Sequence, residues 1–417
     1  MENINKKLKL VKKKGFYHGT FFITGLDIKL ELFSIGLIRN NEIVQLGNFS
    51  NGLSYEEKQA LIKTLTKDIK SSRKQQIKVN PGICIDIQFQ SLIGGELIKP
   101  SFLKFRLNEK WENCTWGNLL LGNTVEDSNV LITSPDKILW KNPATVKDEY
   151  IGYLVETGPA ILPFLKNRTL TVLRYPNGIE QEAFYQKNCP DYAPSFVKTF
   201  QDEEINYVVC NNFSTLLWLG NQSALEFHVP FNTLRNKKPL EIVFDLDPPS
   251  VEHFPLAIKA AKEMKKLFDK FEIKSYPKLS GGKGLQIHIP LLNTPLTYEE
   301  TRIFTSFIAV YLTEKFPQNF TVERMKKKRG KKLYIDYVQH WSGKTIIAPY
   351  SSRGRLGATV AAPLLWEEMN ENLTPKDFNL YTVRERLMEK GCPFHDFFKQ
   401  KNEAVLPVVE SLKKKGG

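Results

Sequence analysis

Two aspartates separated by a single residue, Asp245 and Asp247, end a short apolar run in the segment VFDLDPP at positions 243–249. If this run is a strand, the two side chains point the same way, with their Cα atoms about 7 Å apart. Carboxylates held so close repel each other unless a cation lies between them, and hard divalent ions are the natural occupants. The pair could instead simply end a strand before the two prolines, because the pattern alone is not specific.

A second segment combines glycines with a lysine, in LSGGKGLQIHIPL at positions 279–291. Ser280, Gly281 and Lys283 would lie in a loop that brings backbone amides and an ammonium against phosphates. The segment lacks the spacing of a P-loop, and it leads into a strand, whereas a Rossmann glycine loop opens a helix. A plain hairpin loop is the alternative interpretation.

A third carboxylate, Asp336, lies in a predicted strand after the basic run MKKKRGKK, and Arg353 and Arg355 follow the next strand. Three carboxylates would complete a site for two metal ions that promote in-line phosphoryl displacement. Each guanidinium could bind two oxygens of a triphosphate at once. The alternatives are that the lysine run is a solvated face and that the arginines pair with surface acids.

The composition limits the class of protein that could carry such a site. The 417 residues are 41% hydrophobic and 12% aromatic, which excludes global disorder, and their number predicts two or three domains. A net charge of +14 suits a nucleic-acid partner, because lysine and arginine displace condensed counterions. A merely soluble basic protein would carry the same charge.

Cysteine usage and hydropathy indicate the compartment. The five cysteines are scattered without a C-x-x-C pair, which fits a reducing interior and argues against a disulfide framework or a zinc finger. No apolar run approaches the length that spans a bilayer, so we expect a cytoplasmic protein with no membrane partner.

The elements that must position these residues fall into two groups. Residues 1–121 contain predicted strands parted by Gly, Asn and Asp turns, with one helix at 54–70 that Ser54 would cap, and they suggest a small barrel. Residues 122–132 read as a linker. Residues 133–417 follow with the order strand, helix, strand, helix, strand, strand, which predicts an α/β or α+β sheet with helices on one side. The predicted strands of the first group lie at 16–25, 29–38, 41–49 and 82–93, and the later elements lie at 240–247, 256–273, 283–291, 298–316, 331–339 and 344–351.

Taken together, these motifs resemble a known family, the polymerase domain of bacterial ligase D within the archaeo-eukaryotic primase superfamily. The resemblance covers about residues 134–401 and implies a primase-like mixed sheet with helices. It is carried by SPDKILWKNPATVKDEYIGYL, RTLTVLRYPNGIEQEAFYQK, LLWLGNQSALEFHVP, VFDLDPP, SGGKGLQIHIPL, YIDYVQ, KTIIAPYSSRGR and VAAPLLWEEM.

The resemblance implies roles for residues at the matching positions. The metal ligands for two divalent ions, manganese or magnesium, would be Asp245, Asp247 and Asp336. The incoming nucleoside triphosphate would be held by Ser280, Gly281, Lys283, His228, Gln339, Arg353 and Arg355. A 5′-phosphate at a DNA end would be held by Lys137 and Lys147, and the bent template would be contacted by Phe184, Tyr185 and Lys187, since aromatic faces stack on bases and cations bind phosphates.

The same resemblance implies a function in non-homologous end joining. We expect template-directed addition of nucleotides, with ribonucleotides preferred, to DNA ends and gaps. The DNA would carry a 5′-phosphate at a gap or beside a 3′-overhang, and Ku and a separate ligase are candidate partners near the nucleoid. A primase that starts chains without a primer is one alternative, and a non-catalytic module that bridges DNA ends is another. The lysine pair favours gap filling, and the three carboxylates favour catalysis.

The sequence departs from the family at a position next to the glycine loop. Gln286 stands where the family usually has a histidine, and His288 follows two residues later, on the same face of the predicted strand. A shift of about 6–7 Å separates these two positions, so His288 need not replace the missing histidine. Glutamine would therefore reduce the activity or serve as a working variant.

The N-terminal group resembles the OB-fold that ends ATP-dependent DNA ligases, over about residues 15–121. The match rests on GFYHGTFFITG and KPSFLKFRLNEKW. The chain contains no K-x-D-G nucleophile motif, so we expect no ligase activity from it alone. An OB-fold β-barrel without its catalytic partner could still bind DNA or protein.

Overall fold

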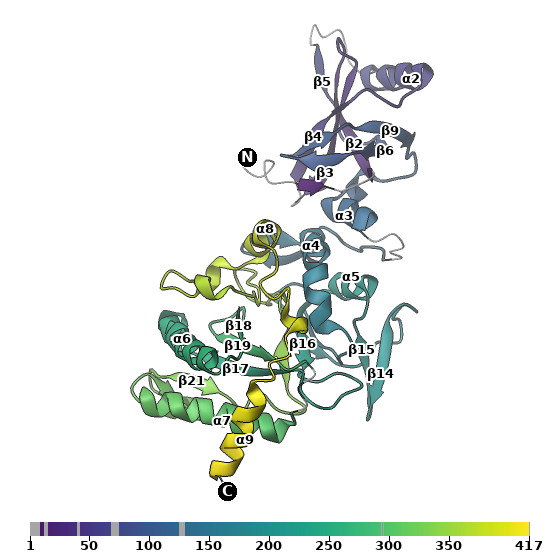
Figure 1. Ribbon diagram of the computed structural model, residues 1–417. Helices are drawn as coiled ribbons and strands as arrows, with labels where there is room; N and C mark the ends of the chain where they lie inside the picture. Colours follow the sequence, from purple (N-terminus) through teal and green to yellow (C-terminus); the bar gives the residue numbers. More distant parts are fainter. Residues whose placement is uncertain are drawn as a thin grey trace. The chain divides into compact units, whose positions relative to one another are not determined.

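The computed structural model describes residues 9–11, 16–39, 42–67, 75–124, 130–292, 294 and 296–416. Its contacts divide the chain into two units, drawn in Figure 1: the first comprises Met1–Lys137 with Thr145–Val155, and the second comprises Ile138–Ala144 with Glu156–Gly417. The domain limits 1–121 and 133–417 stay predictions, and residues 125–129 of the predicted linker 122–132 lie outside the described residues. None of the described helices is long and apolar enough to cross a membrane.

The first unit is built on a curved sheet of six antiparallel strands. The sheet has the order β4-β3-β2-β6-β9, with β5 paired to β2. Its core is aromatic, and the rings of Phe21, Phe33 and Phe89 are fully buried. The six strands are β2 (Tyr17–Asp27), β3 (Leu32–Arg39), β4 (Glu42–Phe49), β5 (Gln76–Lys78), β6 (Cys84–Phe89) and β9 (Ser101–Phe105). The strands predicted at 16–25, 29–38 and 41–49 are thereby confirmed, whereas the single strand predicted at 82–93 is divided between β6 and a strand of another sheet at Ser91–Ile93. The OB-fold identity stays a prediction.

Two helices and a small sheet complete the first unit. Helix α2 (Tyr55–Thr66) begins after Ser54, whose side chain accepts a hydrogen bond from the Glu57 amide, as the N-cap prediction required. Helix α3 (Trp116–Thr124) follows the last strand of the large sheet. The small sheet pairs β7 (Ser91–Ile93) with both β1 (Lys9–Val11) and β8 (Glu96–Ile98).

The chain passes from the first unit to the second along three consecutive elements. These are β10 (Ile138–Lys141), β11 (Ala144–Val146) and α4 (Lys147–Leu165). Helix α4 begins in the first unit and enters the second after Val155.

The second unit contains a five-stranded sheet with the order β18-β19-β17-β21-β20. Only the β20–β21 pair is parallel among the strand pairs described in this sheet. Two long helices pack on one face, because Phe244 contacts both Phe268 and Phe304. The elements are β17 (Glu241–Asp247), α6 (Phe254–Lys270), β18 (Tyr276–Leu279), β19 (Leu285–Pro290), α7 (Tyr298–Lys315), β20 (Phe320–Thr321) and β21 (Leu333–Asp336). The expected sheet with these helices on one side is confirmed, except that the last predicted strand, at 344–351, contributes Thr345–Ile347 to a different sheet.

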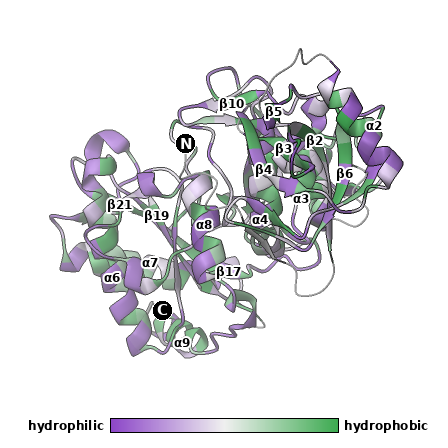
Figure 2. Cartoon of the chain, turned by 90° about the horizontal axis from the view of Figure 1, so that it is seen from above, coloured by the Kyte–Doolittle hydropathy of each residue, from purple (hydrophilic) through white to green (hydrophobic). Residues whose placement is uncertain are grey.

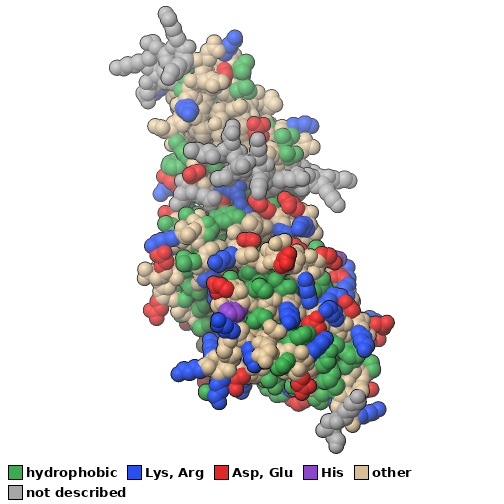
Figure 3. All heavy atoms as spheres, turned by 90° about the vertical axis from the view of Figure 1, so that its left-hand side faces the viewer, with side chains coloured by type: hydrophobic (Ala, Val, Ile, Leu, Met, Phe, Trp, Pro, Cys, Tyr) green, Lys and Arg blue, Asp and Glu red, His purple; other side chains and the backbone are tan. Residues whose placement is uncertain are grey.

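Helix α6 shows why this packing occurs. Its apolar residues Ala257, Ala261, Met264 and Phe268 recur at helical spacing and are buried, while lysines occupy the outer side. The hydropathy colours of Figure 2 show the hydrophilic side of α6. Basic and acidic side chains are interspersed on the face of the second unit in Figure 3, so this face carries no continuous basic patch.

A second, four-stranded antiparallel sheet lies in the same unit, with the order β13-β12-β16-β22. Its strands are β12 (Thr171–Arg174), β13 (Phe184–Gln186), β16 (Ala224–Pro230) and β22 (Thr345–Ile347). The remaining elements of the unit are the hairpin β14 (Lys198–Asp202) and β15 (Ile205–Val209), and helices α5 (Phe213–Asn221), α8 (Leu380–Lys390) and α9 (Val405–Gly416).

Candidate active site

The register of the five-stranded sheet brings the three aspartates to one face. Asp245 on β17 lies directly opposite Asp336 on β21, and Asp247 lies opposite Tyr334. Residues directly opposite each other on neighbouring strands share a face, and so do residues two apart on one strand. Asp245, Asp247 and Asp336 therefore point away from the face that α6 and α7 cover.

The pKa of the Asp245 carboxyl is raised to about 6, chiefly by burial. A hydrogen bond from Gln286 lowers this pKa, whereas the neighbouring Asp336 and Asp247 raise it. That bond runs from Gln286 Nε2 to Asp245 Oδ1 over 3.2 Å. The site thus contains negative charge that its surroundings stabilise poorly, which is the electrostatic condition for binding a cation.

The other two carboxylates are held by hydrogen bonds and cationic side chains. Asp247 lies 3.2 Å from Lys283 Nζ and 3.3 Å from Arg329 Nη1. Asp336 Oδ1 accepts hydrogen bonds from the Tyr334 hydroxyl at 3.1 Å and from the Gln339 amide at 3.0 Å.

With these contacts in place, no three His, Cys, Asp or Glu side chains in the described part of the chain converge to ligate one metal ion. The backbone nevertheless places three carboxylates in adjacent positions, and carboxylate oxygens are the ligands that hard divalent ions prefer. The donor set therefore fits such ions, provided that Asp247 exchanges its contacts with Lys283 and Arg329 for the metal.

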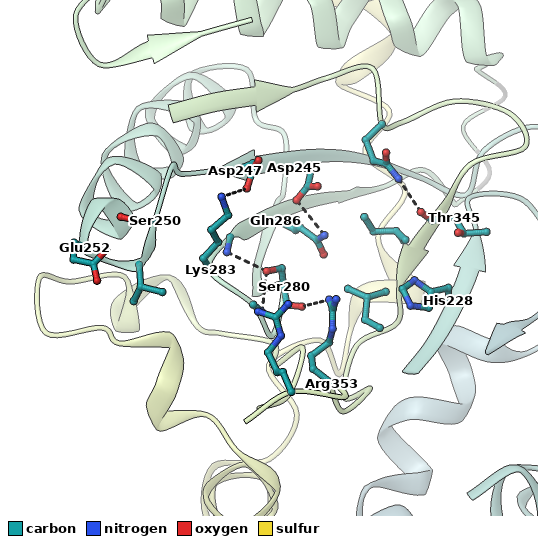
Figure 4. A pocket seen from close by; sticks show the side chains of 17 residues that line it. His228, Asp245, Asp247, Ser250, Glu252, Ser280, Lys283, Gln286, Thr345 and Arg353 are labelled. Atoms are coloured by element: carbon teal, nitrogen blue, oxygen red, sulfur yellow. Dashed lines mark hydrogen bonds and ion pairs between the residues drawn. The ribbon is translucent and has the colours of Figure 1, made fainter. Parts of the chain in front are cut away.

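A cavity of about 650 Å³ opens beside these residues, which is the size range of pockets that bind small molecules. Figure 4 shows side chains from several elements around it. Eight of the residues expected to hold metals or nucleotide line it together with Gln286: His228, Asp245, Asp247, Ser280, Lys283, Gln339, Arg353 and Arg355. Asp336 and Gly281 are not among the described lining residues.

The glycine loop is held in one conformation by hydrogen bonds within the loop. The Ser280 hydroxyl accepts hydrogen bonds from the amides of Gly282 and Gly284, each over 3.1 Å. Gly281 has a φ of +70°, and a Cβ added there would lie 2.6 Å from Arg353 Cγ. Only glycine therefore fits at position 281, where it shapes the loop without facing the cavity.

An acid that the sequence analysis did not select connects the nucleotide-binding candidates. Glu226 Oε2 lies 3.0 Å from His228 Nε2, and Glu226 Oε1 lies 3.2 Å from Arg353 Nε. Burial opposes ionisation of Glu226, but the hydrogen bond to His228 and the charge of Arg353 outweigh it and lower the pKa. Arg353 also donates to the Ser280 carbonyl at 2.9 Å, so it joins the glycine loop to β16. The sequence carried one signal for Glu226. It lies two residues before His228, so in a strand the two side chains share a face.

The contacts of Gln286, which stands where the family usually has a histidine, explain how its side chain is oriented. Gln286 lies between Lys278 and Asp245 in the sheet, and the Lys278 ammonium donates to Gln286 Oε1 at 2.6 Å. Lysine is only a donor, so this bond turns the amide nitrogen of Gln286 toward Asp245. His288 instead contacts Glu241 at 2.7 Å, is almost fully buried, and does not line the cavity. His288 therefore does not take the place of the family histidine.

The two lysines expected at a DNA 5′-phosphate lie in the first unit. Lys147 is buried, and its ammonium donates to the Thr133 carbonyl at 2.6 Å. Burial, and to a lesser extent the charge of Lys137, lower the pKa of Lys147 to about 8. The two cations therefore repel each other, and an anion would relieve that repulsion.

The residues expected at the template lie on and beside β13 in the second unit. Phe184 and Tyr185 are 44% and 70% exposed, and Lys187 is exposed as well. The Arg174 guanidinium lies 5.2 Å from the centre of the Phe184 ring. Exposed aromatic rings beside cations suit a surface that binds unpaired bases.

Comparisons with known proteins point to one family. The family model described as "LigD, primase-polymerase domain" matches residues 146–394, more than half of the chain. The chain is 43% identical over 406 residues to the bifunctional non-homologous end joining protein LigD of Bacillus subtilis, covering 97% of this chain and 66% of the relative. It is 33% identical over 247 residues to the multifunctional LigD of Mycolicibacterium smegmatis, covering 58% of this chain and 32% of the relative.

A solved structure is similar to the second part of the chain. It is the polymerase domain of Mycobacterium tuberculosis ligase D in complex with DNA, with a TM-score of 0.60 and 28% sequence identity. The match covers 66% of this chain and 99% of that domain. This chain thus spans slightly less than two thirds of the Bacillus relative and about a third of the Mycolicibacterium one.

Proposed function

This chain belongs to the LigD primase-polymerase family, and from that membership we propose that it adds nucleotides to DNA ends and gaps under template direction. LigD primase-polymerase domains are nucleotidyltransferases of non-homologous end joining, and the family is metal-dependent. The observation that carries the proposal is the pairing of Asp245 with Asp336 on neighbouring strands, next to Asp247 and the cavity. We propose that these three carboxylates hold two divalent ions, manganese or magnesium.

The residues of the chain would divide the work of phosphoryl transfer. Bound divalent ions would supply charge neutralisation at the attacking and leaving oxygens. Gln286 engages Oδ1 of Asp245 and so orients this carboxylate. Lys283, Arg353 and Arg355 line the cavity and would bind the triphosphate, where guanidinium groups can contact two oxygens each. His228, held by Glu226, and Gln339 would complete the nucleotide site with Ser280 and Gly281.

The DNA-binding part of the proposal assigns two groups of residues. Lys137 and Lys147 would bind the 5′-phosphate of a DNA end, and Phe184, Tyr185 and Lys187 would contact the template. The solved relative is a complex with DNA, which supports DNA as the substrate. Ribonucleotide preference, Ku and a separate ligase as partners, and a cytoplasmic location at the nucleoid belong to the same proposal. The proposal also includes an OB-fold for the first unit and no ligase activity from this chain alone.

Nucleotide addition at a short gap tests the proposed function. The substrate is a gapped duplex with a recessed 5′-phosphate, supplied with manganese and with either ribonucleoside or deoxyribonucleoside triphosphates. Extension of the primer opposite the template supports the proposal. Products formed without a primer would identify a primase instead, and binding without extension by folded protein would leave a module that bridges DNA ends.

Replacing both lysines of the proposed phosphate site should separate two substrates. We expect Lys137→Ala with Lys147→Ala to weaken extension at a phosphorylated gap by at least about tenfold, because two charge-assisted contacts are lost. Extension of a simple primer on an open template should stay near the wild-type rate. The measurement is kcat/KM for DNA on the two substrates, and an equal loss on both would count against the assignment of these lysines.

The preference for a 5′-phosphate should also depend on pH. The pKa of Lys147 is lowered to about 8, so the side chain of the free protein loses its proton as the pH rises through that value. A 5′-phosphate is already a dianion there and binds the protonated amine, so the preference should fall between about pH 7 and pH 9. Binding of phosphorylated and unphosphorylated gaps at each pH measures this. A constant ratio would exclude Lys147 as the titrating group, and Lys147→Ala should abolish the dependence.

A further inference from the structure

The first turn of helix α4 is held by other residues of the first unit. Asp148 is buried, and its carboxylate accepts hydrogen bonds from Thr115 Oγ1 at 2.6 Å and from the Gly117 amide at 3.0 Å. A Cβ added to Gly117 would lie 2.2 Å from Asp148 Oδ1, so only glycine allows this approach. The start of α3 and the start of α4 are therefore joined through one buried carboxylate.

A buried ion pair joins the same turn to strand β3. Arg39 Nε donates to Glu149 Oε1 at 2.8 Å, and the side chains are 7% and 1% exposed. The Arg39 guanidinium lies 5.1 Å from the centre of the Trp116 ring, which packs it against α3. Buried charges are expensive unless they are paired, so this contact fixes its partners tightly. We call Arg39, Thr115, Gly117, Asp148 and Glu149 the α4 clamp.

The α4 clamp lies next to the lysine pair along the chain. Lys147 immediately precedes Asp148, and its amide donates to the Lys137 carbonyl at 2.8 Å. The Asp148 amide donates to the Pro135 carbonyl at 2.9 Å. Backbone hydrogen bonds thus join the turn that contains Lys137 to the start of α4, which contains Lys147. The clamp holds this same start of α4.

We propose that the α4 clamp is a positioning device that sets Lys137 and Lys147 for a DNA 5′-phosphate through contacts with β3 and α3 of the same first unit. The inference rests on the proposed function of the two lysines. The sheet and helix α3 of the first unit would thereby take part in recognising the DNA end, in addition to any direct contact with DNA that they make. Asp148 and Thr115 act here through the lysines and do not contact the DNA.

Substitutions in the clamp should change the phosphate preference selectively. The test uses the full chain and compares its affinity for a gapped duplex with and without the 5′-phosphate, by fluorescence anisotropy. Thr115→Val keeps the shape of the side chain but removes one hydrogen bond to Asp148, and we expect it to lower the preference about fivefold. Asp148→Asn removes the charge and should lower the preference further.

A matched control is available in the same unit. Thr20 Oγ1 donates to Asp86 Oδ1 at 2.7 Å, and neither residue belongs to α4 or to the clamp. Thr20→Val should therefore keep the wild-type preference. Thermal unfolding shows which variants are folded. If Asp148→Asn does not fold, the test rests on Thr115→Val.

Three results would overturn the inference. Folded clamp variants could keep the wild-type preference, or they could lose affinity for both duplexes equally, as a purely structural role predicts. A wild-type protein without any preference would refute the phosphate site itself, which distinguishes failure of the proposed function from failure of the clamp.

Discussion

Asp245→Asn should lower the rate of nucleotide addition by at least about a thousandfold, because the loss of an anionic metal ligand removes several kcal/mol of transition-state stabilisation. Affinity for gapped DNA should stay near the wild-type value, since none of the residues assigned to DNA lines the cavity that contains Asp245. Single-turnover extension and anisotropy measure the two quantities. Asp269→Asn, at an exposed position on α6, is the matched control and should keep full activity.

The same substitution should not destabilise the metal-free protein. The pKa of Asp245 is raised by burial to about 6, from 3.8, so the folded state binds this proton more tightly than the unfolded chain. Stability should therefore rise as the pH falls from about 6 toward 4, and the ionised carboxylate costs stability at neutral pH. An asparagine side chain in its place carries no such charge, so the unfolding temperature of the variant at pH 7 without metal should equal or exceed that of wild type. A large decrease would mean that lost activity reflects unfolding.

Lys283→Met should lower kcat/KM for the nucleoside triphosphate by about 10- to 150-fold, the effect of losing one charge-assisted contact to phosphate. Lys283 lines the cavity, and its ammonium lies 3.2 Å from Asp247 and 3.0 Å from the Pro249 carbonyl. It is thus placed to move from a carboxylate to a phosphate when nucleotide and metal bind. Steady-state kinetics with varied nucleotide measure the loss.

An exposed lysine on α6 provides the control for this substitution. Lys262→Met removes the same charge from the chain without touching the cavity that Lys283 lines, so its kinetics should match wild type. If Lys283→Met left the KM for nucleotide and kcat unchanged, the glycine loop would not be the triphosphate site.

The sequence was sufficient to place part of the active site. The alternation of side chains in a strand put Asp245 and Asp247 on one face, and the helical spacing of apolar residues predicted α6 and its buried side. Pairing Asp245 with Asp336 depends on the register between β17 and β21, which lie far apart in the chain. No local pattern fixes that register, so the sequence offered Asp336 only as a candidate third carboxylate, which the resemblance to a family then assigned to the same site.

Polar contacts between distant segments were not predictable from the sequence. The contacts of Glu226 with His228 and Arg353, and of Lys278 with Gln286, join strands whose neighbours follow only from the sheet order. The contacts that hold the start of α4 within the first unit were equally unpredictable, because a single buried acid leaves no periodic pattern in the sequence. Proximity along the chain placed this turn in the second predicted domain, whereas its contacts assign it to the first unit.

The most direct test of the account is a crystal structure of the protein with manganese and a non-hydrolysable nucleoside triphosphate, examined by anomalous scattering. Two manganese peaks should lie between the carboxylates of Asp245, Asp247 and Asp336, with the triphosphate against Lys283 and Arg353. Manganese bound elsewhere, or an Asp336 that contacts neither ion while the nucleotide is in place, would contradict the proposal that these three aspartates form the catalytic metal site.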